Sequence, residues 1–173
     1  MKSNTAALMF EVHNALGEGP LWHPTEHRLY WVDILAGDLF KTMADLSGYE
    51  KTHLKTQIGA FAFEADGGLL LATADGFAHW REGQEALDYF WDPLPDREDV
   101  RLNDGKVDPA GRFWAGSMDF THKKGHLYRL DPDGGHHTIL NNIGISNGLG
   151  WSPDRKTMYY TDSLQFTIFA FDY

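Results

Sequence analysis

The chain has 173 residues, of which 42% are hydrophobic and 23% are charged, as is ordinary for a globular domain with its own core. Its formal net charge of −10 argues against nucleic acid and anionic membranes as partners, because both repel an acidic surface. The absence of cysteine excludes disulfides and thiolate metal sites, and no apolar run is long enough for a membrane span or a secretory signal. We therefore expect a cytoplasmic protein in which any metal ligand is an oxygen or an imidazole.

Four segments share one pattern, in which an apolar run, a tight turn and an aromatic or β-branched run follow one another. They are residues 21–34, 61–76, 106–119 and 150–163, with their turns at Pro24, Ala65, Pro109 and Pro153. The pattern therefore recurs at intervals of 41, 44 and 44 residues. Hairpins that recur at this interval are typical of the blades of a β-propeller.

A further strand-like run follows each hairpin, at residues 38–43, 77–81, 126–131 and 167–173. No segment keeps a 3.6-residue apolar period over the length of a helix, so the expected class is all-β. We interpret the chain as a β-propeller of about four blades. Two stacked sheets in a sandwich are the alternative that the same hairpins allow.

Three polar clusters lie next to the first strand of a predicted hairpin. They are Gly17–Pro20, Arg101–Lys106 and Ile145–Leu149. Their carboxylate and amide oxygens suit a hard divalent cation, and a guanidinium suits an oxygen-rich ligand. Taken singly, each cluster is also compatible with an ordinary turn or with a side chain that is bonded by backbone amides.

Equivalent positions of successive blades surround the axis of a propeller. We therefore expect Glu18, Asn103 and Asn147 to converge from three blades on one axial site. Strand alternation places Arg101 on the same side as Asn103. The mixed oxygen donors suit Ca²⁺, Mg²⁺ or Mn²⁺, and Zn²⁺ is also compatible. The second repeat has no such cluster, which leaves one blade without a ligand.

Longer stretches around these clusters resemble a known family. GEGPLW (17–22), RLNDGKVDPAGRFWAGSM (101–118), ISNGLGWSPD (145–154) and YYTDS (159–163) are similar to motifs of the SMP-30/gluconolactonase/regucalcin-like family. The combination of WAGSM (114–118) with LYRLDPDG (127–134) looks most like its bacterial sugar lactonases. The resemblance runs from about residue 11 to the end. It implies a six-bladed propeller with one divalent cation on its axis. Residues 1–173 would then form a single domain of about four blades, truncated at its C-terminus.

The resemblance also implies roles for particular residues. Glu18 and Asn147 match metal ligands of the family, and Arg101 matches a residue that contacts substrate. Asn103 matches a residue beside the metal that contacts substrate or water. The family's remaining ligand, which is also the usual general base, is an aspartate beyond Tyr173, so the catalytic residue is unknown here.

Two further aspartates could be confused with acidic residues of the family, namely its remaining metal ligand and an acidic residue that contacts substrate. We expect Asp162 to be structural because of its place in a second hairpin strand. Asp119 is the residue nearest to an acidic substrate contact of the family, although its register leaves that match open. We interpret the nine histidines as surface residues and the charged run from Asp96 to Asp99 as solvated.

The activity implied by the resemblance is metal-dependent hydrolysis of a sugar (aldono-) lactone to the free acid. The cation, Ca²⁺, Zn²⁺, Mn²⁺ or Mg²⁺, would act as a Lewis acid on the lactone carbonyl. One alternative is a non-catalytic partial propeller that binds a cation or ligand and needs another chain to complete it. Another is a related esterase or phosphotriesterase. Open sheet edges also allow self-association.

Overall fold

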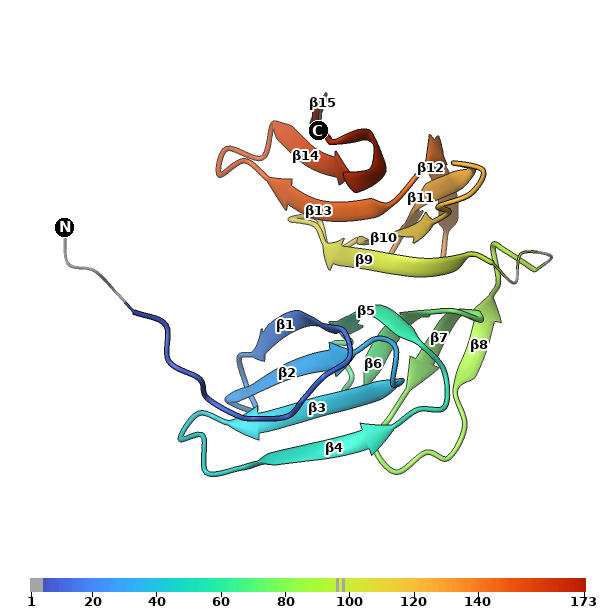
Figure 1. Cartoon of the computed structure of the whole chain (residues 1–173). Helices are drawn as coiled ribbons and strands as arrows, with labels where there is room; N and C mark the ends of the chain where they lie inside the picture. Colours follow the sequence, from blue (N-terminus) through green and yellow to red (C-terminus); the bar gives the residue numbers. More distant parts are fainter. Residues whose placement is uncertain (1–4, 96, 98) are drawn as a thin grey trace.

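The computed structural model describes residues 5–95, 97 and 99–173, and these residues form four antiparallel sheets (Figure 1). The strands follow one another in chain order within each sheet, and the first strands of the four sheets face a common centre. This arrangement confirms the predicted β-propeller, and the sandwich alternative is wrong. Within the same residues, no helix has the length and hydropathy needed to cross a membrane.

Each sheet is a meander that runs from the centre outward. Blade 1 contains β1 (Gly17–His23), β2 (Arg28–Asp33), β3 (Asp38–Met43) and β4 (Tyr49–His53). Blade 2 contains β5 (Ile58–Phe63), β6 (Leu69–Thr73), β7 (Gly76–Trp80) and β8 (Asp88–Trp91). Blade 3 contains β9 (Arg101–Val107), β10 (Phe113–Met118), β11 (Gly125–Leu130) and β12 (His136–Ile143). Blade 4 contains β13 (Ser146–Trp151), β14 (Thr157–Asp162), the 3-10 helix η1 (Ser163–Gln165) and β15 (Thr167–Asp172).

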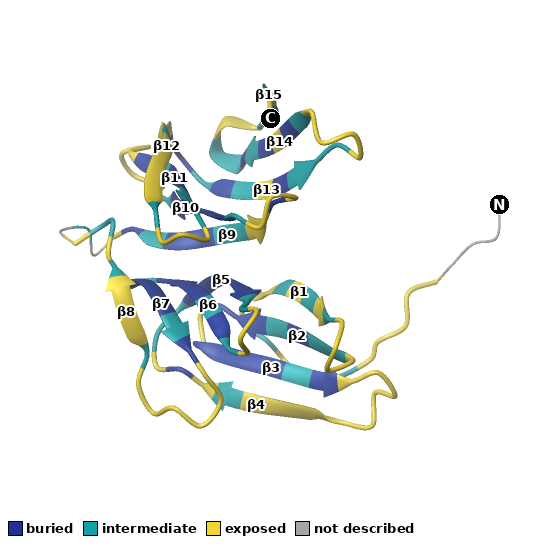
Figure 2. Cartoon of the chain, turned by 180° about the vertical axis from the view of Figure 1, so that it is seen from behind, coloured by how far each residue is buried: buried dark blue, intermediate teal, exposed yellow. Residues whose placement is uncertain are grey.

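The predicted hairpins are the first two strands of each blade, and the predicted outer strands are the third ones. The fourth strands β4, β8 and β12 were missed. They pair with β3, β7 and β11 through their backbones, but most of their side chains are exposed (Figure 2). A strand that buries neither face has no apolar alternation to reveal it.

Apolar side chains fill the space between neighbouring blades. Tyr30 and Val32 of blade 1 pack with Ile58 and Leu71 of blade 2. The other two interfaces hold further clusters, one around Phe77, Leu102 and Tyr128 and one around Trp114, Leu127 and Tyr160. Blades stacked in this way remove large aromatic and aliphatic surfaces from water, which is the main force that holds neighbouring blades together.

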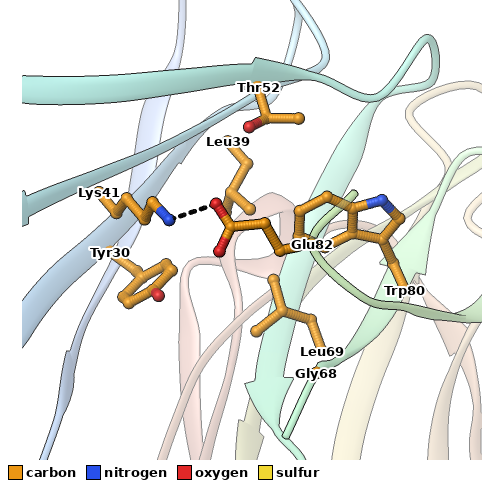
Figure 3. Close-up of a pocket in the computed structure, with 8 residues that line it drawn as sticks. All are labelled: Tyr30, Leu39, Lys41, Thr52, Gly68, Leu69, Trp80 and Glu82. Atoms are coloured by element: carbon orange, nitrogen blue, oxygen red, sulfur yellow. Dashed lines mark hydrogen bonds and ion pairs between the residues drawn. The ribbon is translucent and has the colours of Figure 1, made fainter. Parts of the chain in front are cut away.

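A small pocket also lies at the interface between blades 1 and 2 (Figure 3). Its volume is about 70 Å³, and its walls include Leu39, Leu69 and Trp80. The Lys41 ammonium lies beside it and pairs with the Glu82 carboxylate at 2.6 Å. A space of this size is far below what a sugar needs, so we assign it to imperfect packing between the sheets.

Two aspartates at the ends of second strands hold the chain as it enters a blade. The carboxylate of Asp33 accepts a hydrogen bond from the backbone amide of Leu16, and Asp162 accepts from Gly144 and Ile145 at 2.9 and 3.0 Å. Burial would raise the pKa of each carboxyl group, but these amides offset it and hold both pKa values below the usual range. The structural role expected for Asp162 is therefore confirmed.

Candidate active site

The innermost strands β1, β5, β9 and β13 surround the axis, and β9 packs against both β5 and β13. The three predicted polar clusters lie within β1, β9 and at the start of β13, rather than before the strands as the sequence indicated. Their side chains therefore have positions fixed by sheet register. This gives the candidate site a more rigid frame than turns would provide.

Local irregularities in the inner strands direct these side chains. The register of β1 shifts after Glu18, and that of β13 shifts after Asn147. Before the shift, Glu18 is opposite Val32 and Asn147 is opposite Thr161, one residue before the aspartates that end β2 and β14. Glu18 and Asn147 thus occupy equivalent positions in blades 1 and 4. β-Bulges commonly reorient side chains in this way next to functional sites.

Asn103 joins blade 3 to blade 4. Its side-chain nitrogen Nδ2 donates to the backbone oxygen of Ser146 at 2.8 Å and to Oδ1 of Asn147 at 3.2 Å. Its Oδ1 accepts from Nη1 of Arg101 at 2.7 Å, which bears out the prediction that the two side chains share one side of the strand. Asn103 is only 8% exposed, so its hydrogen bonds fix both amide groups firmly.

Asn147 is held from a second direction by η1. Its Nδ2 donates to Oγ of Ser163 at 2.9 Å, while its Oδ1 accepts the bond from Asn103. An amide oxygen has two lone pairs, so Oδ1 keeps one for a further partner. The side chain is therefore oriented with an acceptor still available.

Glu18 is exposed, and among the described residues its carboxylate makes no hydrogen bond or ion pair. It borders a cleft of about 530 Å³ together with Asp104 of β9 and Gly148 of β13. Burial lowers the pKa of Arg101, and the nearby charge of Glu18 partly offsets this effect. The structure thus places Glu18 in one cleft with the residue next to Asn147, and close enough to Arg101 for their charges to interact.

Asp104 belongs to this site, although the sequence indicated only a turn around it. Its Oδ2 accepts from the backbone amide of Gly148 at 2.7 Å, across the interface between blades 3 and 4. Burial raises the pKa of Asp104, and the bond from Gly148 opposes that rise. The sequence carried no separate signal for it, because Asn-Asp-Gly is common in turns.

Arg101 borders a second cleft, also of about 530 Å³. Thr56, Asp75 and Met118 contribute to its walls from the connections and strand ends of blades 1 to 3. Its volume lies within the range of small-molecule sites, and its walls are polar enough to bind hydroxyl groups.

Asp119, whose match to a substrate contact the sequence left open, has a structural role in this fold. It is 1% exposed, and its carboxylate accepts from Nη2 of Arg97 at 2.7 Å and from the backbone amides of His122 and Lys124. Burial would raise the pKa of Asp119, but these amides and the Arg97 guanidinium lower it well below its usual range. Asp119 is not among the residues that line the two clefts beside Glu18 and Arg101.

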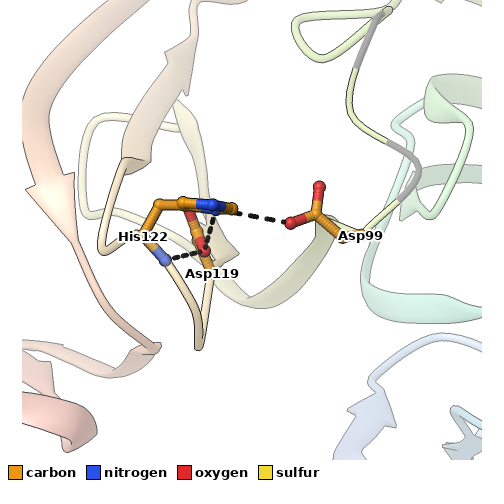
Figure 4. A group of neighbouring side chains, drawn as sticks. All are labelled: Asp99, Asp119 and His122. Atoms are coloured by element: carbon orange, nitrogen blue, oxygen red, sulfur yellow. Dashed lines mark hydrogen bonds and ion pairs between the residues drawn. The ribbon is translucent and has the colours of Figure 1, made fainter.

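The charged run before β9 is therefore not simply solvated, because Arg97 reaches this buried carboxylate. Asp96 and Glu98 lie outside the described residues. Asp99, Asp119 and His122 bring one ligand atom each to within 4.8 Å of one another (Figure 4). The donors that already surround Asp119 account for this cluster without a cation.

Comparisons with known proteins agree with this fold. The family described as "SMP-30/Gluconolactonase/LRE-like region" matches residues 16–173. Pentonolactonase XacC of Haloferax volcanii is 34% identical over 91% of the chain, and 6-deoxy-6-sulfogluconolactonase of Pseudomonas putida is 33% identical over 91%. The crystal structure of a calcium-binding protein, regucalcin, from Agrobacterium tumefaciens covers 95% of the chain with a TM-score of 0.88 and 25% identity.

The chain spans little more than half the length of these relatives. It covers 53% of the pentonolactonase, 55% of the sulfogluconolactonase and 56% of the regucalcin chain. The four blades described above therefore correspond to part of each relative.

Proposed function

Since the chain belongs to the SMP-30/gluconolactonase/LRE-like family, we propose that it takes part in the hydrolysis of a sugar lactone to the free sugar acid, with one divalent cation as cofactor. The observation that carries the proposal is the equivalent placement of Glu18 and Asn147 on the innermost strands of two blades. Relatives named as lactonases for a pentonolactone and for a sulfogluconolactone support a sugar lactone as the substrate class.

The side chains at the axis have the chemistry that a hard cation requires. Glu18 offers a carboxylate with no protein partner among the described residues, and Asn147 offers an amide oxygen with a free lone pair. Asp104 lies in the same cleft, where its carboxylate is engaged by the backbone amide of Gly148. Oxygen donors of this kind suit Ca²⁺, Mg²⁺ or Mn²⁺, and Zn²⁺ also accepts carboxylate ligands. The residues therefore fit the cation, with Glu18 and Asn147 as its ligands.

When bound, the cation supplies a Lewis acid that polarises the lactone carbonyl. The chain's own residues would bind and orient the substrate. Arg101 keeps guanidinium hydrogens beyond its bonds to Leu102 and Asn103, and these would hold ring oxygens in the adjoining cleft. Asn103 has both amide hydrogens engaged within the protein, so its contact with substrate would use its carbonyl oxygen. This pair would fix the orientation of the lactone before attack.

A panel of aldonolactones tests the proposal. Turnover is followed by the proton that the acid product releases, after treatment with a chelator and after addition of Mn²⁺, Ca²⁺, Zn²⁺ or Mg²⁺ one at a time. Glu18→Gln and Asn147→Ala should each lower metal-dependent turnover by at least 100-fold, since ligands are lost. Glu85→Gln and Asn141→Ala, which alter exposed residues of the same types, should keep wild-type rates.

Other results would favour the alternatives. Equal rates in the wild type and both site variants would contradict the assignment of Glu18 and Asn147. Faster turnover of phosphotriesters than of every lactone would favour a related hydrolase. Cation binding without turnover of any ester would favour a binding protein that needs another chain.

A further inference from the structure

The bulge in β13 leaves one backbone amide outside the sheet. Asn147 is opposite Thr161 and Leu149 is opposite Tyr160, so Gly148 has no opposing residue in β14. Its φ of +49° lies in the left-handed region, and an added Cβ would approach Oγ1 of Thr161 to 2.8 Å. Position 148 therefore favours glycine, and its N–H must find a partner other than the neighbouring strand.

Asp104 supplies that partner from the next blade. Its Oδ2 accepts the Gly148 amide at 2.7 Å. The preceding residue, Asn103, donates to the backbone oxygen of Ser146, on the other side of Asn147. Two consecutive residues of β9 thus hold the peptide groups on both sides of Asn147.

We propose that Asp104 is a positioning residue that fixes the Gly148 bulge and thereby aims the side-chain oxygen of Asn147 at the axial cation. This inference rests on the proposed function, because it takes Asn147 as a ligand of that cation. Partners that orient ligands commonly change metal affinity by about 10- to 100-fold when they are removed.

The exposure of Gly148 separates this role from a merely structural one. Once Asp104 is truncated, water can satisfy the Gly148 amide, so most of the folding stability should remain. A water molecule would not hold the Gly148 backbone in one fixed orientation, as the Asp104 carboxylate does. Asn147 would keep its bonds to Asn103 and Ser163 but would lose one of the constraints on its backbone.

Titration of the full chain with Mn²⁺ alone tests the role of Asp104. Asp104→Ala should weaken Mn²⁺ binding by about 10- to 100-fold, while its thermal unfolding midpoint stays within about 4 °C of the wild type. Asp104→Asn keeps an oxygen that can accept the Gly148 amide, so it should recover affinity to within about threefold of the wild type. The amide proton of Gly148, followed by NMR, should shift in Asp104→Ala and return toward its wild-type position in Asp104→Asn.

Three outcomes would overturn the inference. Unchanged Mn²⁺ affinity in Asp104→Ala would show that the bulge does not depend on this carboxylate. Equal losses in Asp104→Ala and Asp104→Asn would show that the charge itself matters, as for a direct ligand. An unfolding midpoint that falls with the affinity would indicate a purely structural role.

Two reference variants distinguish a failure of the role proposed for Asp104 from a failure of the proposed function. If Glu18→Gln and Asn147→Ala leave Mn²⁺ affinity unchanged, the axial cation site itself is wrong, and the role of Asp104 fails with it. If both variants lose affinity while Asp104→Ala binds as the wild type does, only the role of Asp104 is removed.

Discussion

Asn103 donates its side-chain amide to the side-chain oxygen of Asn147 at 3.2 Å, although the two residues belong to different blades. The same amide reaches the backbone of Ser146, and the carboxylate of Asp104 reaches Gly148. The candidate site is therefore assembled by contacts between β9 and β13. Its geometry depends on how the two blades are packed, as well as on the residues themselves.

Asn103→Ala should destabilise the fold as well as the site. The change leaves the buried backbone oxygen of Ser146 without this donor and leaves Nη1 of Arg101 without a side-chain acceptor. An unsatisfied buried group costs about 1–3 kcal/mol, so the free energy of unfolding in urea should fall by about that amount. The exposed control Asn141→Ala should change it by less than about 0.5 kcal/mol. Equal values for the two variants would contradict the bridging role of Asn103.

Gly59→Ala should be far more damaging than Gly150→Ala. An added Cβ at position 59 would lie 2.4 Å from the backbone oxygen of Leu102 and 2.6 Å from that of Asn103. Backbone atoms cannot rotate away, so β5 must move from β9 at a cost of about 3 kcal/mol. A Cβ at position 150 meets nothing within 4 Å. Urea unfolding measures both costs, and similar values would show that the inner strands are not packed this closely.

Asp162→Asn should lose a contribution to stability that depends on pH. The pKa of Asp162 is lowered from 3.8 because its bonds to backbone amides outweigh its burial. Its contribution is therefore complete above about pH 4 and is lost as the pH falls through the lowered pKa. At pH 7 the variant should unfold more easily by about 2 kcal/mol, since an amide nitrogen cannot accept from Gly144 or Ile145.

The same comparison at acid pH supplies the check. As the pH falls below 4, the difference in unfolding free energy between the wild type and Asp162→Asn should shrink, because the wild-type carboxylate becomes protonated. A difference that stays constant from pH 7 to pH 2 would show that Asp162 contributes through its shape rather than its charge.

Addition of a divalent cation should stabilise the wild-type chain. A cation that binds the folded state alone, at about 100 times its dissociation constant, adds about 3 kcal/mol to the free energy of unfolding. A chelator should remove this gain. Glu18→Gln should gain little from the same Mn²⁺ concentration, whereas Glu85→Gln should match the wild type. Equal gains in all three proteins would place the cation elsewhere.

The hairpins could be predicted because their turns and apolar runs recur at a regular interval. The third strands followed from the same alternation. The fourth strands could not be found, since β4 and β12 expose nearly all of their side chains and depend on backbone pairing to β3 and β11. A strand that is stabilised mainly by the neighbour it pairs with leaves little trace in the pattern of hydrophobic residues.

The placement of the candidate site residues could be predicted in part from motifs and from strand alternation. Arg101 and Asn103 share a side as alternation requires, and Glu18 and Asn147 reach equivalent positions. The role of Asp104 was missed because its partner is a backbone amide 44 residues away. The structural role of Asp119 could not be predicted for a similar reason, since its partner Arg97 belongs to a preceding loop. Long-range bonds of this kind depend on tertiary packing and have no local signature.

Because sheet register fixes Glu18 and Asn147, the connecting loops can change in length and sequence without moving these two residues. The connections β4–β5 and β6–β7 contribute Gln57 and Asp75 to the cleft beside Arg101. They take no part in the pairing of β1 with β2 or of β13 with β14. Lengthening or exchanging these loops would reshape that cleft. Under the proposed function, substrate preference would therefore diverge through loop changes alone, while the innermost strands keep Glu18 and Asn147 in the same register.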